Sequence, residues 1–375
     1  MLTTSNSRKC VALFLSAWVF VGEVHSAQPG ENQLRAVLEA SRAEFELPGL
    51  RAAVQAGEQP LLEVAVGVAD LESNTPLTTE IGMPGGSTGK TFVATVTLLL
   101  VEEGTLSLDD LVIDWLGEER WFNTLPNAGT IKVKHLLSHS SGIGDYPDTL
   151  GFNLAMVWRA LRTGSARFTP EELIGYVSNK ALFPAGEGFA YSDAGYLVLG
   201  RVLEAASGRS YHDLVLERVI RPLQLDQVRL QNESSLREVA TGYSGTTPSV
   251  RPDGRQKFDP SSEWTGGGLI TTPAMLVKFY RALAKGELVE ANTLQLMIEE
   301  GFKDPTSSHH YGLGFFVIDE RISHGGRWPG YRSWVFHDFS RDLTIAVQAN
   351  RDDDVDLPVI MERIGMLTLD GHAAQ

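Results

Sequence analysis

The sequence predicts an α/β protein of the α+β type, in which one antiparallel sheet takes strands from both chain ends and is flanked by helices. Strand-like runs occur before about residue 70 and again after about residue 310, whereas the periodic runs between them are mostly helical. We therefore expect a signal peptide at 1–26, an α/β domain formed by 27–105 together with 265–375, and a mainly helical insert at 106–264.

The first part of the chain predicts a helix, a hairpin and a second helix. Residues 31–47 have helical periodicity, and residues 50–70 form two β-rich runs around the turn residues 57–60. Residues 87–103 are apolar almost all round and stop at Gly104, which is typical of a buried helix.

The rest of the chain predicts further helices and the remaining strands. Residues 194–208 read as a helix that closes on a glycine. Later segments predict a helix at 273–286, strand-like runs at 311–319, 331–339 and 343–351, and a final helix at 356–369. Both chain ends therefore supply strands to the expected sheet.

Residues 1–26 have the pattern of a secretory signal peptide. Arg8 and Lys9 form a basic end, residues 10–22 are an apolar stretch, and small residues near Ser26 suit cleavage. Cleavage would remove Cys10, the only cysteine, so we expect neither a disulfide nor a catalytic thiol. We expect a secreted or periplasmic product without a stable membrane anchor.

Composition and charge exclude several classes of protein. Of 375 residues, 43% are hydrophobic and 21% are charged, which is typical of a globular protein. The net charge of −15 argues against nucleic acid or an anionic membrane as a partner. His135 and His139 are four residues apart, but no third ligand is evident, so we expect structural histidines and no metal or cofactor. The sequence leaves the oligomeric state open.

The segment IGMPGGSTGKTFVATVTLLL, residues 81–100, contains three overlapping motifs. A P-loop ending at Thr91 needs a glycine where the chain has Pro84, which has no N–H to donate to a phosphate. A nucleophile elbow should follow several parallel strands, but only a helix and a hairpin precede Ser87. The third motif, S-x-x-K at Ser87 and Lys90, fits this context best.

The S-x-x-K spacing suits nucleophilic catalysis by a serine. Residues i and i+3 share one face of a helix, so Lys90 can lie beside the Ser87 hydroxyl and accept its proton. Because the ordinary pKa of lysine is about 10.4, burial or a nearby cation must lower the pKa of Lys90 before it acts as a base. The Ser87 amide, at the helix N-terminus, points toward an oxyanion.

Two later segments match this chemistry in order along the chain. FAYSDAGYLVLGRVLE, residues 189–204, places Tyr191 before a helix, and ISHGGRWPGYRSWVFHD, residues 322–338, places His324 and two glycines next to a strand-like run. With S-x-x-K, these segments resemble the penicillin-recognising serine hydrolases, which include class C β-lactamases, D-alanyl-D-alanine carboxypeptidases, D-aminopeptidases and related carboxylesterases. The resemblance covers residues 47–350 and implies a β-lactamase/transpeptidase-like fold.

The resemblance also implies a role for each matching residue. Ser87 matches the acylated serine, Lys90 its partner base and Tyr191 the proton shuttle. The strand motif from His324 to Gly326 would line the substrate site. The amide of Arg327 would join the Ser87 amide as the second oxyanion donor, and each such donor contributes roughly 3 kcal/mol.

Asp193 departs from the family pattern, in which an Asn amide donates to the acyl-amide carbonyl of the substrate. An ionised aspartate only accepts hydrogen bonds, and close to Lys90 it would favour the charged lysine. This argues against efficient β-lactam hydrolysis and favours esters, or peptides whose free amine Asp193 could bind. The alternative is that Asp193 only caps the helix starting near Ala194. His324 replaces a permanent cation with one expected to titrate near pH 6.5.

The sequence therefore predicts an exported serine hydrolase that forms an acyl-enzyme on small esters or D-amino-acid-containing peptides. D-aminopeptidase, DD-carboxypeptidase and esterase activities stay open at this point, with a small molecule or a peptide as the substrate. The alternatives are a β-lactamase proper and a penicillin-binding, sensor-like protein that is acylated without turnover.

Overall fold

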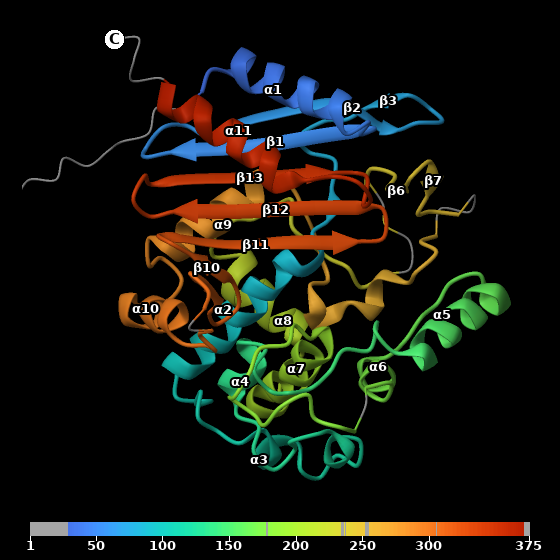
Figure 1. The fold of residues 1–375 in the computed structure, drawn as a ribbon, viewed down its shortest axis with the longest axis vertical. Coiled ribbons are helices and arrows are strands. Elements are labelled where there is room, and N and C mark those ends of the chain that lie inside the picture. Colours follow the sequence, from blue (N-terminus) through green and yellow to red (C-terminus); the bar gives the residue numbers. More distant parts are fainter. Residues whose placement is uncertain are drawn as a thin grey trace, which may run out of the picture.

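The computed structural model describes residues 29–177, 179–233, 236, 238–251, 255–304 and 306–370. The predicted signal peptide at residues 1–26 lies outside the described residues. Helices cover both faces of an antiparallel sheet (Figure 1), which confirms the predicted fold class. Within the described part of the chain, no helix is long and apolar enough to cross a membrane.

The central sheet combines strands from both ends of the chain. Its eight strands follow the order β3-β2-β1-β13-β12-β11-β10-β9. The N-terminal strands are β1 (Gly49–Ala56), β2 (Leu62–Asp70) and β3 (Thr75–Pro76). The C-terminal strands are β9 (His309–Tyr311), β10 (Phe316–Ile318), β11 (Arg321–Trp328), β12 (Tyr331–Asp338) and β13 (Leu343–Ala349). β1 pairs with β13, with Val54 opposite Ile345, so strands from both ends meet in mid-sheet.

One prediction about the C-terminal strands is wrong, and one strand was not indicated by periodicity. The run at 311–319 is not one strand, because β9 and β10 are separated at residues 312–315, where Gly314 has a φ of +99°. A positive φ interrupts an extended chain. Residues 321–328 form strand β11, which contains the His324-Gly325-Gly326 motif, although periodicity did not indicate a strand there. Glycine is depleted in strands, so β11 depends on its pairing with β12.

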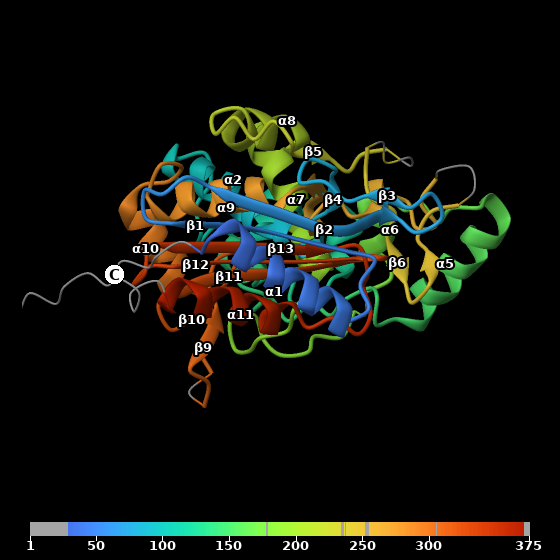
Figure 2. The ribbon, with the colours of Figure 1, turned by 90° about the horizontal axis from the view of Figure 1, so that it is seen from above.

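Helices pack on both faces of the sheet (Figure 2). They are α1 (Glu31–Glu44), α2 (Gly89–Glu102), α9 (Pro273–Ala284) and α11 (Leu357–Asp370). Successive strand side chains point to opposite faces, and this alternation decides which layer each residue joins. Val54 and Ile345 pack in the cluster that includes α1 and α11, whereas Ala53 and Ala346 pack in the cluster that includes α2 and α9.

The middle of the chain is mainly helical. It contains α3 (Val112–Leu116), α4 (Val133–Leu137), α5 (Leu150–Thr163), α6 (Pro170–Ile174), α7 (Asp193–Ser207) and α8 (Tyr211–Val215). The remaining elements are β4 (Met83–Pro84), β5 (Arg229–Leu230), β6 (Tyr243–Ser244), β7 (Thr247–Pro248), β8 (Leu269–Thr271) and α10 (Ala291–Glu299). Helix α2 packs against both the sheet and the helical region, as its apolar residues predict, so its N-terminus lies where the two parts meet (Figure 1).

Candidate active site

Ser87 lies in a short 3-10 turn, Gly86–Thr88, that leads into α2. The turn packs tightly against β11. Gly86 has a φ of +55°, and a Cβ atom at this position would lie 2.7 Å from the Arg327 nitrogen. Only glycine fits both this backbone conformation and this approach. The serine is therefore held at the N-terminus of a buried helix, partly exposed and directly beside the edge of β11.

Lys90 is completely buried and has three hydrogen-bond acceptors. Its Nζ donates to Ser87 Oγ at 3.2 Å, to Asp193 Oδ1 and to the carbonyl of Gly266. Burial by itself lowers the pKa of Lys90, but the charge of Asp193 and its hydrogen bond to Lys90, with a smaller contribution from the Tyr191 hydroxyl, outweigh burial and raise this pKa above its ordinary value. The resting lysine is therefore an ammonium group.

Tyr191 faces the same lysine from just before α7. The Lys90 Nζ lies 5.1 Å from the centre of the Tyr191 ring. The Tyr191 hydroxyl is buried and has no hydrogen bond of standard geometry, although Lys90 and Ser87 are close enough to influence its charge. Burial raises the pKa of Tyr191 to about 12, against the opposing effect of Lys90. The phenol is therefore neutral at physiological pH.

Asp193 is the first residue of α7, and it is not the cap of that helix. The capping residue is Ser192, whose Oγ accepts a hydrogen bond from the Gly195 amide at 3.0 Å. The alternative that Asp193 merely caps the helix is therefore wrong. Its carboxylate pairs with Lys90 and keeps 28% of its surface exposed, so a solvent-borne group can reach it.

Two further carboxyl groups lie near the Lys90–Asp193 pair, and no sequence motif indicated them. Asp145 accepts a hydrogen bond from the Ala194 amide at 3.1 Å, and burial together with Asp193 raises its pKa to about 7. Glu263 accepts a hydrogen bond from Gln231 at 3.0 Å. Burial raises the pKa of Glu263 to about 8, although Lys90 opposes the shift. One lysine thus shares its surroundings with three acidic side chains.

His324 is neutral, contrary to the expected titration near pH 6.5. The side chain is buried, its Nδ1–H donates to the Gly325 carbonyl at 2.7 Å, and its Nε2 accepts from the Tyr311 hydroxyl at 2.9 Å. Burial, and then the charge of Lys90, lower the pKa of His324 to about 3. His324 therefore shapes the pocket wall and supplies no positive charge for a substrate. Tyr311, its partner, was not among the predicted site residues.

The glycines of β11 let the strand pass close to the Ser87 turn. A Cβ atom on Gly326 would lie 1.9 Å from the Gly85 carbonyl oxygen, which also accepts a hydrogen bond from Ser333. The backbone of Arg327, the next residue, passes beside Gly86, while its side chain is exposed to solvent. The amides of Ser87 and Arg327 therefore belong to two segments in direct contact.

His139 lies beyond the end of α4, at a φ of +55°, so it does not share a helical face with His135. Its ring packs against Tyr191, with the ring centres 4.1 Å apart, and its Nδ1 accepts from the Ser192 amide at 3.1 Å. Burial lowers the pKa of His139 well below the usual value, with Lys90 adding to the shift. His139 thus supports the floor of the site. No cluster of potential metal ligands occurs among the described residues.

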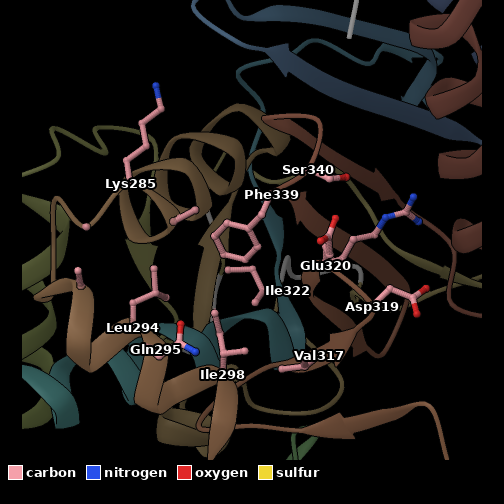
Figure 3. Close-up of a pocket in the computed structure, with 14 residues that line it drawn as sticks. Lys285, Leu294, Gln295, Ile298, Val317, Asp319, Glu320, Ile322, Phe339 and Ser340 are labelled. Carbon is pink, nitrogen blue, oxygen red and sulfur yellow. The ribbon is translucent and has the colours of Figure 1, made fainter. Parts of the chain in front are cut away.

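A pocket of about 220 Å³ opens beside Ser87. Its lining residues are Ser87, Tyr191, Phe316, His324, Gly325, Gly326, Arg327, Arg332, Ser333, Trp334, Leu357 and Pro358. A larger hollow of about 630 Å³ lies near the start of β11, between α10 and the β10–β11 turn (Figure 3). Side chains such as Ile298, Ile322 and Phe339 line this second hollow, which contains neither Ser87 nor Lys90. Ser87 and Tyr191 thus line the smaller space, whereas Lys90 and Asp193 are not among its lining residues.

The fold and the site together define a class of protein. A serine and a buried lysine lie one turn apart at a helix N-terminus and face a tyrosine and a glycine-containing strand, which is the arrangement expected of a serine-hydrolase site. The family model described as Beta-lactamase matches residues 34–365, and the chain belongs to this family. The chain is thus a serine hydrolase related to the β-lactamases.

Individual relatives and solved structures are similar to this chain. Penicillin-binding protein 4 of Amycolatopsis lactamdurans is 32% identical over 65% of this chain and 61% of its own length. The D-aminopeptidase of Brucella anthropi is 28% identical over 77% of this chain and 53% of its own length. Among solved structures, the D-amino acid amidase of Ochrobactrum anthropi SV3 has a TM-score of 0.76, with 22% identity, 91% coverage of this chain and 99% of that chain. The chain thus spans only about half to three-fifths of the length of these two sequence relatives.

Proposed function

We propose that this protein is an exported hydrolase that forms an acyl-enzyme at Ser87 and acts on small esters or on D-amino-acid derivatives with a free amine. The observation that carries this proposal is the position of Asp193, whose carboxylate lies against Lys90 while part of its surface is exposed. A substrate ammonium bound there gains a charge-assisted hydrogen bond, and a simple ester needs no amide donor at this place. The D-aminopeptidase and amidase among the similar proteins support this substrate class.

The site groups account for both halves of the reaction. Lys90 first releases one proton to solvent. Ser87 Oγ then attacks the carbonyl carbon and passes its proton to the neutral Lys90, and the amides of Ser87 and Arg327 stabilise the oxyanion. The protonated Lys90 and the Tyr191 hydroxyl then deliver a proton to the departing amine or alcohol, which leaves an ester on Ser87. A water molecule attacks this ester, and Ser87 recovers its proton as the acid is released.

Substrate binding can also supply the missing base. An ammonium group at Asp193 competes with Lys90 for the carboxylate and adds a positive charge near Nζ. Both effects lower the pKa of Lys90 and favour its neutral form. Substrates with a free amine should therefore have a higher kcat and a lower KM than their N-acetylated counterparts.

A substrate screen combined with mass spectrometry tests the proposal. Wild-type protein should turn over p-nitrophenyl esters or D-amino-acid amides many times and should gain one adduct, on the Ser87 peptide, with a fluorophosphonate. Ser87→Ala should lose both properties while keeping the Tm of the wild type. Equal labelling of Ser87→Ala, or turnover that survives the substitution, contradicts the assignment.

A second candidate is a penicillin-binding protein that is acylated without turnover. The similarity to penicillin-binding protein 4 of Amycolatopsis lactamdurans favours this candidate. A burst of one product molecule per enzyme, followed by no steady turnover on any ester, amide or chromogenic cephalosporin, would identify this candidate. Steady turnover of the cephalosporin would instead identify a β-lactamase proper.

Export is a separate part of the proposal and rests on residues 1–26. The mature N-terminus should lie near Ser26 or Ala27 when the full chain is produced in a bacterium with a periplasm. N-terminal sequencing of the periplasmic and cytoplasmic fractions checks this expectation. A chain that keeps residue 1 and stays in the cytoplasm contradicts it.

A further inference from the structure

Helix α5 exposes an unusual amount of apolar surface. Its outward side chains are Leu150, Leu154, Val157, Trp158 and Leu161, with exposed fractions of 73%, 61%, 53%, 57% and 84%. On its inward face, Phe152 is buried against the helical region. A helix that is apolar on both faces is normally buried on both faces. Both views place α5 at the outer edge of the molecule, where a partner could reach it (Figures 1 and 2).

This exposure is specific to α5. Among the described residues, α10 and α11 each expose one large hydrophobic side chain, and no other helix exposes any. Scattered single apolar residues are normal on protein surfaces, whereas a continuous patch marks an interaction site. The outward apolar side chains of α5, named here the apolar stripe, therefore indicate an interaction site.

The spacing of the apolar stripe indicates a second helix as the partner. Leu150, Leu154, Val157 and Leu161 are separated by four, three and four residues, which is the seam of a coiled coil. The spacing reads the same in both chain directions. In an antiparallel pair of identical helices, Leu150 therefore faces Leu161 of the second copy, and Leu154 faces Val157. A two-fold axis requires such reciprocal contacts.

The charges around α5 favour the same antiparallel arrangement. Residues 150–163 contain no acidic side chain, and Arg162 is exposed in the last turn, beside the ring of Trp158 at 5.0 Å. Asp148 is exposed just before the start of the helix. Antiparallel pairing brings each Arg162 close to the Asp148 of the other copy, and it also opposes the two helix dipoles. Parallel pairing would place like charges side by side.

We propose that α5 is a self-association surface through which two copies of this chain pair about a two-fold axis. Such an interface is centred on one helix of 14 residues. It is smaller than the roughly 800 Å² per partner of a standard stable interface, so the dimer should dissociate on dilution. The inference concerns α5 alone and is independent of the reaction catalysed at Ser87.

Sedimentation velocity over a range of protein concentrations tests the proposal. Wild-type protein should shift from monomer to dimer between about 1 and 200 μM, the range expected for a weak interface. Leu154→Glu and Leu161→Glu should stay monomeric, with unchanged Tm and esterase activity. Leu182→Glu is the matched control, because Leu182 is 59% exposed outside α5. Wild-type protein that is monomeric throughout, or a control that dissociates the dimer equally, overturns the proposal.

Disulfide trapping tests the orientation of the helices. In a Cys10→Ser background, Leu150→Cys mixed with Leu161→Cys should form a cross-linked dimer on mild oxidation. Neither variant should cross-link alone, because its two cysteines would lie about 16 Å apart along the antiparallel pair. Efficient cross-linking of either single variant overturns the antiparallel arrangement. Binding of a monomeric wild type to phosphatidylglycerol vesicles would instead assign α5 to a membrane and overturn self-association.

Discussion

At the scale of single residues, the charge balance around Lys90 distinguishes this site. The ammonium is held by Asp193, and both Asp145 and Glu263 lie close enough to feel the charge of this pair. An Asn in place of Asp193 would remove a negative charge from direct contact with Lys90. Asp193 therefore raises the proton affinity of the lysine, and under the proposed function it also selects the group that a substrate places beside it.

Asp193→Asn should change specificity more than stability. The amide can donate to the carbonyl of an N-acylated substrate, so kcat/KM should move toward N-acylated peptides and away from free-amine derivatives by roughly tenfold, or about 1.4 kcal/mol. Steady-state kinetics on matched pairs of free and N-acetylated D-amino-acid esters measure this change. Ser192→Ala is the control, since loss of the true cap should cost about 1 kcal/mol of stability and leave the specificity ratio unchanged. If Asp193→Asn has the same ratio of kcat/KM values on N-acetylated and free-amine substrates as wild type, Asp193 does not determine specificity.

Lys90 and Tyr191 should behave as one proton-transfer unit. Lys90→Ala and Tyr191→Phe should each lower kcat about 10²-fold or more, because each removes a group that moves the Ser87 proton. The double variant should lose far less than the product of the two single losses, since residues that act together are not additive. Single-turnover acylation rates for the four proteins measure the coupling. Complete additivity would show that the two side chains serve separate steps.

At the scale of elements, the site depends on the close contact between strand β11 and the turn before α2. Gly326→Ala should lower the acylation rate by 10²-fold or more, because its Cβ atom would lie 1.9 Å from the Gly85 carbonyl and push the Arg327 amide away. Gly365→Ala is the matched control, because nothing lies within 4 Å of a Cβ atom at that position. Stopped-flow acylation measures both variants. An unimpaired Gly326→Ala would show that β11 does not position an oxyanion donor.

The same contact explains which element was hard to predict. Helices α1, α2, α7, α9 and α11, the first hairpin, β12 and β13 follow from periodicity, because each carries its own apolar pattern. Strand β11 carries two glycines and a buried histidine in its centre, so its sequence lacks the alternation of a strand. Its neighbour β12 supplies the pairing that makes it one. The residues that weaken the local signal are those that let the strand reach Ser87.

At the scale of the whole molecule, buried carboxyl groups should make stability fall with rising pH. Burial raises the pKa of Glu263 from 4.5 to about 8. A raised pKa stabilises the folded state below about pH 4.5, and this contribution is lost as the pH rises to about 8. The Tm of Glu263→Gln minus the Tm of wild type should therefore be higher at pH 9 than at pH 5, by about 2 °C or more.

Calorimetry at the two pH values measures this effect. Asp109→Asn is the control, because Lys132 and Lys134 lower the pKa of Asp109 to about 2. The stability that this lowered pKa contributes is present above pH 3.8 and is lost only as the pH falls toward 2. The difference in Tm between pH 5 and pH 9 should therefore be the same for Asp109→Asn as for wild type. A Glu263→Gln variant with the same pH dependence as wild type would contradict an elevated pKa.

The sequence by itself determined those features of the site that depend on residues close together in the chain. The three-residue spacing of Ser87 and Lys90 places both on one helical face, and Tyr191 and His324 stand out by motif and order. Only the tertiary structure decided their charge states. Lys90 meets Asp193 and Gly266, 103 and 176 positions away in the chain, and His324 loses its proton because it is buried near this same lysine. Burial and charge act through space, so proton affinities appear only when distant segments are brought together.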